Sequence, residues 1–117
     1  MRGVEARRLD LSSVDDAARS IEPIGAAMVV HTIGLTSVER CEAEPGLAQY
    51  VNVDVAFNVA AACSKIGVPL VHISSDHLFS GRTSLVDEGH PVAPVNVYGR
   101  TKAGAESRVL DVHEGAL

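Results

Sequence analysis

The sequence predicts an α/β domain with a parallel sheet flanked by helices. Apolar runs of strand length, at 26–31 and 70–73, alternate with longer segments whose apolar residues recur every three or four positions. Strands that alternate with helices are joined by crossover connections, which make neighbouring strands parallel. Because the runs are continuously apolar, we expect both faces of the sheet to be buried. Polar residues follow each run, at the edge where such sheets bind ligands.

The composition limits the classes of protein that the chain can belong to. Its 117 residues make one domain at most, and 46% hydrophobic with 21% charged residues is typical of a globular chain. A net charge of -5 and only 3% aromatic residues argue against nucleic acid as a partner. No apolar run is long enough for a membrane span or a signal peptide, so a cytoplasmic protein is expected. Cys41 and Cys63 form no CxxC motif and are expected to be buried free thiols.

The first third of the chain predicts two strands around one helix. A short strand is expected at 4–9, and a helix follows from Ser13 to Ile21. Ser13 is a favourable N-cap, and two aspartates in the first turn suit the helix dipole. Pro23 ends this helix. The apolar run at 26–31 is the second strand.

The middle and the end of the chain predict two more helices around a third strand. A loop is expected at 32–45, then a long helix at 46–66, with Leu47, Tyr50, Val51, Val55, Val59 and Ala62 or Cys63 on its inner face. Gly67 is a good C-cap, and Pro69 prevents continuation. The strand at 70–73 leads into a long loop at 76–97, and loops of this length are usually functional. The last helix covers about 98–112.

Three side chains in this pattern suit the reduction of a carbonyl group. Tyr98 and Lys102 are four residues apart, so a helix places them on one face. A ketone that accepts hydride develops negative charge on its oxygen and needs a proton donor. The ammonium of Lys102 would favour the phenolate of Tyr98 and lower its pKa from the usual value of about 10. Ser75, at the end of the strand, could donate a hydrogen bond to the same oxygen.

Five segments, in order, resemble the dTDP-4-dehydrorhamnose reductase group of the extended short-chain dehydrogenase/reductase superfamily. That group has Ser-Thr-Asp-Tyr-Val-Phe-x-Gly after a strand, a Glu and a Pro, and then Asn-x-Tyr-Gly-x-x-Lys. The matching residues here are Asp10-Leu11, Thr36–Glu42, Asn52, Ser74–Gly81 (Ser-Ser-Asp-His-Leu-Phe-Ser-Gly), and Asn96–Lys102 (Asn-Val-Tyr-Gly-Arg-Thr-Lys), with Glu88, Pro94, Gly104 and Glu106. His77 replaces the family's Tyr, and Val86 stands where the family has an aromatic residue.

The resemblance implies a fold that is only part of the family's. Residues 1–117 would form an incomplete, Rossmann-like NAD(P)-binding domain. It lacks the N-terminal βαβ start with the GxxGxxG turn, whose backbone holds the pyrophosphate, and it lacks the C-terminal substrate lobe. The chain would begin near the family's third strand and end after the helix with the Tyr–Lys pair. It therefore resembles the central fragment of such an enzyme.

The resemblance also assigns roles to individual residues. The catalytic residues would be Ser75, Tyr98 and Lys102. The cofactor, NADPH or NADH, would contact Asp10, Leu11, His31, Thr32, Tyr98 and Lys102. The substrate would contact Ser75, Asp76 and His77. Some alternatives stay open: Asp10 as a plain turn residue, Asp76 as a loop cap, His31 as a structural residue, and Asn52 as a helix-shaping residue or the holder of a water in a proton path. The histidines have no metal-ligand spacing, so no metal is expected.

The implied reaction is hydride transfer from NADPH or NADH to C4 of a 4-keto-6-deoxy sugar nucleotide. One alternative is an epimerase or dehydratase of the same superfamily; the dehydratases carry a Glu where this chain has His77, and epimerases usually lack an Asp at the position of Asp76. Another is a non-catalytic binding protein that resembles the regulatory subunit of methionine adenosyltransferase. A third alternative is a non-functional remnant of such an enzyme. The isolated chain is expected to be inactive and to bind dinucleotide weakly, and whether it forms a homo-oligomer is left open.

Overall fold

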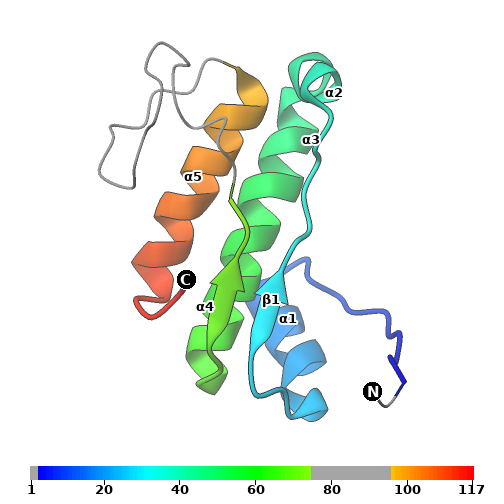
Figure 1. The fold of residues 1–117 in the computed structure, drawn as a ribbon, viewed down its shortest axis with the longest axis vertical. Helices are drawn as coiled ribbons and strands as arrows, with labels where there is room; N and C mark the ends of the chain where they lie inside the picture. The colour runs from blue at the N-terminus through cyan, green and yellow to red at the C-terminus, as the bar shows by residue number, and fades with distance from the viewer. Residues whose placement is uncertain (1–2, 75–95) are drawn as a thin grey trace.

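A two-stranded parallel sheet packs against a layer of helices (Figure 1). The computed structural model describes residues 3–74 and 96–117. Strand β1 (Val29–His31) pairs with β2 (Leu70–His72), with Val29 opposite Leu70 and His31 opposite His72. The two strands are parallel, and the connection between them crosses over through helices. The predicted α/β class with a parallel sheet is therefore confirmed.

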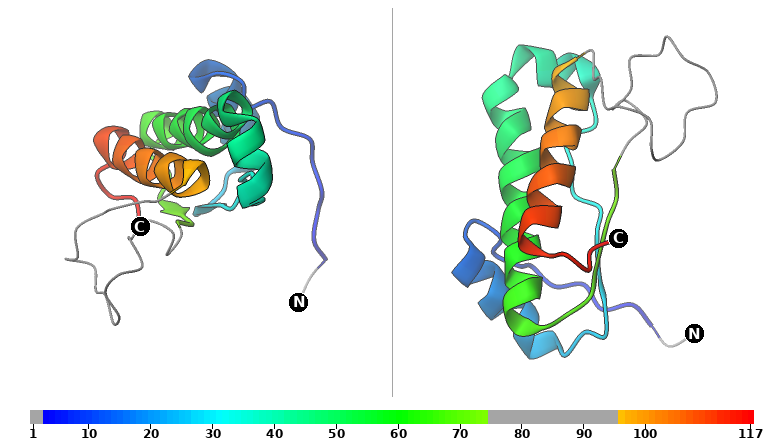
Figure 2. Two further views of the ribbon diagram at one scale, coloured as in Figure 1. Left: turned by 90° about the horizontal axis from the view of Figure 1, so that it is seen from above. Right: turned by 90° about the vertical axis from the view of Figure 1, so that its left-hand side faces the viewer.

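The helices lie on one side of the sheet (Figure 2). Helix α4 lies in the middle of this layer and contacts both α1 and α5. Within the described ranges, no helix is long and apolar enough to cross a membrane. The helical elements are α1 (Val14–Ile21), the 3₁₀ turn η1 (Glu22–Ile24), α2 (Val38–Ala43), α3 (Pro45–Gln49), the π-helical turn η2 (Tyr50–Asp54), α4 (Val55–Ile66) and α5 (Val97–Val112).

The helix ends follow the capping residues of the sequence. The Ser13 side chain accepts a hydrogen bond from the Asp16 amide at 3.0 Å, so α1 begins where it was predicted to begin. Asn96 caps α5 in the same way, accepting from the Gly99 amide at 2.7 Å. Gly67 ends α4 with a left-handed φ of 75°, which glycine adopts without steric cost.

The long helix predicted at 46–66 exists, but its inner face differs from the prediction. The helical path runs from α3 through η2 into α4, and the π turn holds one residue more than an α turn does. Regular spacing is therefore not kept across it. Tyr50, predicted to face inward, is 43% exposed, whereas Asn52 and Val53 are buried. The prediction was wrong for Tyr50 and correct for Val55 and Val59.

Two elements were predicted wrongly near the strands. The strand expected at 4–9 does not form, since in the described part of this segment Val4 is 85% exposed and no backbone ladder joins it to β1. A short strand without a pairing neighbour is not stable. The loop expected at 32–45 contains α2, which Ser37 caps by accepting from the Arg40 amide at 3.2 Å. Arg40 also pairs with Glu44 at 2.8 Å one turn further along.

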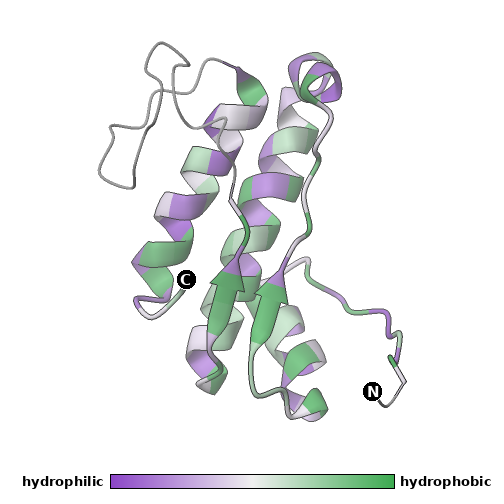
Figure 3. Cartoon of the chain, in the orientation of Figure 1, coloured by the Kyte–Doolittle hydropathy of each residue, from purple (hydrophilic) through white to green (hydrophobic). Residues whose placement is uncertain are grey.

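The sheet is buried on one face only, which corrects the expectation that both faces are covered. Alternate strand residues point to opposite faces, and Val30, on the face away from the helices, is 54% exposed. Both strands are apolar in Figure 3, so this exposed face is apolar as well. The core lies between the sheet and the helices and includes Ile21, Val53, Val55, Ala56, Val59, Ala60, Cys63, Leu70, Ala105 and Val109.

The end of the chain returns to the sheet beside β2. The Leu117 amide donates to the Leu70 carbonyl at 2.9 Å, and the His72 amide donates to the Leu117 carbonyl at 2.7 Å. Leu117 thus sits on the edge of β2 that β1 does not occupy. The end of β2 is therefore held from both sides.

Cys41 and Cys63 are both buried and free, as the sequence predicted. Burial raises the pKa of each thiol above its ordinary value, and thiols of this kind are poor nucleophiles. The Cys41 thiol donates to the Leu35 carbonyl at 3.4 Å, and Cys63 belongs to the core. Both cysteines therefore serve the packing of the domain.

Candidate functional site

Lys102 is a buried lysine at the carboxyl end of β2. The Asn96 cap sets the start of α5, and Lys102 comes four positions after Tyr98 on that helix. Lys102 is only 6% exposed, and its Nζ donates to the Ile73 carbonyl at 2.8 Å. The ammonium is therefore fixed at the point where β2 ends, one helical turn from Tyr98.

The charged group of Lys102 is buried, which is uncommon for a lysine side chain. Burial lowers the pKa of its ammonium below the ordinary value, and the negative charge of Glu106 opposes that effect. Lysines are rarely buried unless they are paired or have a function. This buried ammonium lies one turn after Tyr98 on α5, at the spacing that the sequence predicted.

Asn52 connects the loop after β1 to α5. Its amide nitrogen donates to the Thr101 hydroxyl at 2.9 Å and to the Leu35 carbonyl at 3.2 Å, while its oxygen accepts from the Leu35 amide at 2.6 Å. The Thr101 hydroxyl in turn donates to the Tyr98 carbonyl at 2.9 Å. Asn52 lies in the π turn, a feature often found at functional sites. These bonds favour the helix-shaping alternative for this residue.

The loop after β1 passes very close to this cluster. A Cβ atom at Gly34 would lie 3.3 Å from the Asn52 side-chain oxygen and 4.0 Å from Lys102 Nζ. Glycine therefore allows the backbone to approach the buried ammonium, and a larger residue would displace the Asn52 side chain. No local pattern in the sequence marks this position, since the approach depends on contacts between distant segments.

His31 and His72 form a stacked pair beneath the same helix. Their rings are 5.5 Å apart and nearly parallel, at 14°. Burial lowers the pKa of each ring from 6.5 to about 4, and the Lys102 charge adds to the effect on both. Among the described residues, His31 Nε2 and both ring nitrogens of His72 have no hydrogen-bond partner. Both histidines are therefore neutral at neutral pH.

Ser74, the last described residue before the proposed catalytic Ser75, is held by α5. Its hydroxyl donates to Glu106 Oε2 at 2.9 Å. Both side chains line a cavity of about 270 Å³ whose other walls are His72, Val109, Leu110, Ala116 and Leu117. The segment that leads into Ser75 is therefore anchored to the helix that carries Tyr98.

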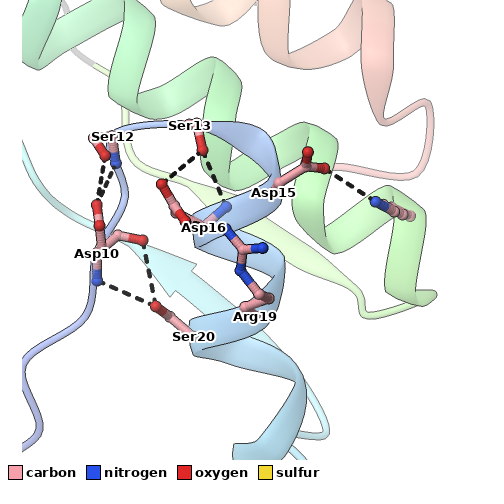
Figure 4. A network of polar contacts seen from close by, with 8 residues as sticks. Asp10, Ser12, Ser13, Asp15, Asp16, Arg19 and Ser20 are labelled. Carbon is pink, nitrogen blue, oxygen red and sulfur yellow. Dashed lines mark hydrogen bonds and ion pairs between the residues drawn. The ribbon is translucent and has the colours of Figure 1, made fainter.

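Asp10 lies in the turn that leads into α1 (Figure 4). Its side chain accepts from the Ser12 amide at 3.0 Å and from the Ser12 hydroxyl at 2.6 Å. Its amide donates to the Ser20 hydroxyl at 3.2 Å. These bonds support the alternative in which Asp10 is a turn residue, and its contact with a cofactor stays a prediction.

Three of the predicted cofactor-binding residues lie around one cavity. Leu11, His31 and Thr32 line a space of about 250 Å³ beside β1, together with apolar residues that include Ile21, Val29, Ile33 and Val59. Tyr98 and Lys102 do not line this cavity but lie at the end of β2. The structure therefore brings the predicted residues together in two groups, along the carboxyl ends of the two strands.

Ser75, Asp76 and His77 lie outside the described residues, so their predicted roles stay predictions. Two residues of the site had no role assigned from the sequence: His72, which stacks on His31, and Glu106, which binds Ser74. One signal for His72 was available, because His31 and His72 are the polar residues within the two apolar runs of strand length. Nothing local links Glu106 to Ser74.

The fold is that of a Rossmann-like α/β domain, and the helix beside the end of β2 carries Tyr98 and Lys102 four positions apart. The family model for the RmlD substrate binding domain matches residues 1–117. The chain therefore belongs to this family, within the extended short-chain dehydrogenase/reductase superfamily, as the sequence predicted.

Individual relatives agree with this assignment. The chain is 31% identical over 111 residues to the probable low-salt glycan biosynthesis reductase Agl14 of Haloferax volcanii, covering 94% of this chain and 37% of the relative. It is 32% identical over 108 residues to methionine adenosyltransferase 2 subunit beta of Pongo abelii, covering 92% and 31%. The dTDP-4-dehydrorhamnose reductase of Bacillus anthracis, solved in complex with NADP, matches with a TM-score of 0.86 and 33% identity, covering 92% and 39%.

The chain thus spans between about a third and two fifths of the length of these relatives.

Proposed function

We propose that this chain supplies the Tyr–Lys part of the catalytic site of an NAD(P)-dependent nucleotide-sugar reductase. The substrate would be a 4-keto-6-deoxy sugar nucleotide, the class that the resemblance to dTDP-4-dehydrorhamnose reductases implies. The proposal includes a cytoplasmic setting, which the two buried free thiols support. One observation carries it: the buried Lys102 ammonium, held at the end of β2 one turn from Tyr98.

The residues present fit part of a dinucleotide. The largely apolar cavity lined by Leu11, His31 and Thr32 would pack against the face of a planar aromatic ring at the carboxyl end of β1, where ligands bind in such sheets. Lys102 would bind a ribose hydroxyl. When bound, a reduced nicotinamide would supply the hydride for the C4 carbonyl of the sugar.

The chain's own residues would supply the proton. Tyr98 would donate it to the C4 oxygen as negative charge develops there, and Ser75 would donate a hydrogen bond to the same oxygen. The Lys102 ammonium would stabilise the phenolate that remains. The Asn52 bonds to Thr101 and Leu35 would keep α5 in place during this step.

The test is a chimera in which residues 1–117 replace the matching span of the Bacillus anthracis reductase. Its consumption of NADPH is followed with a dTDP-4-keto-6-deoxyhexose. Tyr98→Phe should lower turnover by roughly 10²–10⁴-fold, the usual contribution of a positioned acid. The matched control is Tyr50→Phe, which removes the other tyrosine hydroxyl of the chain and should leave turnover unchanged. Full activity of the Tyr98→Phe chimera would overturn the proposal.

A second candidate function is a non-catalytic binding role, which the likeness to methionine adenosyltransferase 2 subunit beta favours. The same chimera separates the two. A chimera that binds NADPH, and whose turnover is insensitive to Tyr98→Phe and to Lys102→Met, would support the binding role.

A further inference from the structure

Two side chains of α5 hold two consecutive residues at the end of β2. Lys102 Nζ donates to the Ile73 carbonyl at 2.8 Å, and Glu106 accepts from the Ser74 hydroxyl at 2.9 Å. Lys102 and Glu106 are four residues apart, so they lie on one face of the helix. The strand end is therefore attached to α5 at two points, directly before Ser75 in the sequence.

The charges around Lys102 make Glu106 the counter-charge. The groups that face the ammonium from the sheet are His31 on β1 and His72 on β2, and both rings are neutral at neutral pH. On α5 itself, Tyr98 lies one turn before and Glu106 one turn after. Among the residues that the structure describes, Glu106 is the acidic group whose charge favours the protonated form of Lys102.

We propose that Glu106 is a positioning residue that acts in two ways. Through Ser74 it fixes the strand end that leads into Ser75, and its negative charge stabilises the buried ammonium of Lys102. The Ser74 hydrogen bond holds the half-buried carboxylate on the side of α5 that faces the sheet. Without this bond the carboxylate could turn toward solvent, and its charge would then act less on Lys102.

The importance of Glu106 for catalysis rests on the proposed function. A reductase that uses Lys102 to stabilise the Tyr98 phenolate needs the lysine protonated over its working pH range. In the chimera, Glu106→Gln should therefore lower kcat at high pH more than at neutral pH and leave KM nearly unchanged. The alkaline limb of the pH profile should move to lower pH, which loss of packing alone would not produce.

The decisive experiment does not need turnover. The chain has only two lysines, Lys65 and Lys102, so lysine labelled with ¹³C and ¹⁵N gives two side-chain signals in the NMR spectrum of the 117-residue protein. The Lys102 signal is titrated with pH, and the signal of exposed Lys65 is the internal reference. Glu106→Gln should move the Lys102 titration midpoint to lower pH. Glu114→Gln, which removes an exposed carboxylate after the end of α5, is the matched control and should not move the Lys102 midpoint.

Ser74→Ala separates position from charge. This variant keeps the Glu106 carboxylate but removes its hydrogen bond, so it should move the Lys102 midpoint in the same direction by a smaller amount. The double variant should behave like Glu106→Gln alone, because both changes act through one contact.

The outcomes distinguish this inference from the proposed function. An unchanged Lys102 midpoint in Glu106→Gln would overturn the role of Glu106, whether or not the chimera is active. A shifted midpoint in the 117-residue protein, together with a chimera whose turnover is unaffected by Tyr98→Phe, would confirm the role of Glu106 and overturn the proposed reaction. Equal shifts in Glu114→Gln and Glu106→Gln would also overturn the inference, since the effect would then be one of net charge.

Discussion

Asn52 is a single side chain that joins three parts of the domain. It is 1% exposed and forms three hydrogen bonds, two with the Leu35 backbone and one with Thr101. Asn52→Ala would remove all three bonds and leave the Leu35 amide without this acceptor; a lost bond costs about 0.5–1.5 kcal/mol, and an unpaired buried donor costs about 1–3 kcal/mol. We expect the free energy of unfolding, measured by urea denaturation, to fall by roughly 3 kcal/mol.

The matched control is Asn58→Ala, which removes one half-buried hydrogen bond to the Leu11 carbonyl. Its expected cost is about 1 kcal/mol. Equal effects of the two substitutions would show that the bonds of Asn52 do not join the loop after β1 to α5 in solution.

The His31–His72 pair makes stability depend on pH. Both folded-state pKa values are lowered from 6.5 to about 4, so between these values the unfolded chain binds more protons than the folded one. The stabilisation is therefore complete above pH 6.5 and is lost as pH falls toward 4. We expect a loss on the order of 1–2 kcal/mol for each ring by about pH 5, measured as the urea midpoint at successive pH values.

Replacing both rings by glutamine should flatten the fall of the urea midpoint over this range, because the titrating groups are then gone. An unchanged urea midpoint from pH 7 to about 4.5 would contradict this account, because it would mean that folding does not lower the pKa values of the two rings.

At the scale of elements, the C-cap of α4 is the feature that the sequence predicted most directly. Gly67 has φ of 75°, a conformation that L side chains adopt only with strain. Gly67→Ala should lower the free energy of unfolding by about 1 kcal/mol. The matched control is Gly46→Ala in the first turn of α3, where a Cβ meets nothing within 4 Å and alanine favours the helix, so a small gain of a few tenths of a kcal/mol is expected. A loss at both positions, seen by the same urea method, would contradict this account of the cap.

The sequence predicted the elements that local chemistry determines and missed those that depend on neighbours. Ser13 and Gly67 each set a helix end within their own few residues. The strand expected at 4–9 needed a pairing partner, which no pattern within the segment supplies. The π turn at Tyr50–Asp54 shifts the inner face without any sign in the apolar spacing.

The same division holds for the candidate site. The Tyr98–Lys102 pair follows from four-residue spacing on a helix, and the sequence predicted it. The stack of His31 on His72 depends on the strand register, and the bond from Ser74 to Glu106 joins residues 32 apart. Only the packing of α5 on β2 brings such residues together.

At the scale of the whole molecule, the two groups of site residues lie toward the carboxyl ends of β1 and β2. The cavity with Leu11, His31 and Thr32 lies beside β1, and the Lys102 cluster lies at the end of β2. Gly34 belongs to the loop that leaves β1 and passes within reach of Lys102. The structure therefore holds an apolar cavity beside β1 and a buried ammonium at the end of β2, the two features on which the proposed function draws.

The 117-residue chain by itself is expected to bind NADPH only weakly. A dinucleotide's pyrophosphate is normally held by backbone amides of a glycine-rich turn at a helix N-terminus, and none of the ten glycines of this chain falls in a GxxGxxG pattern. The cavity with Leu11, His31 and Thr32 offers apolar contact, and Lys102 Nζ already donates to the Ile73 carbonyl. Calorimetric titration should therefore give no saturable heat at NADPH concentrations that saturate the chimera, in which the relative supplies the remaining segments. Tight 1:1 binding to the isolated chain would show instead that residues of this chain supply the pyrophosphate site themselves.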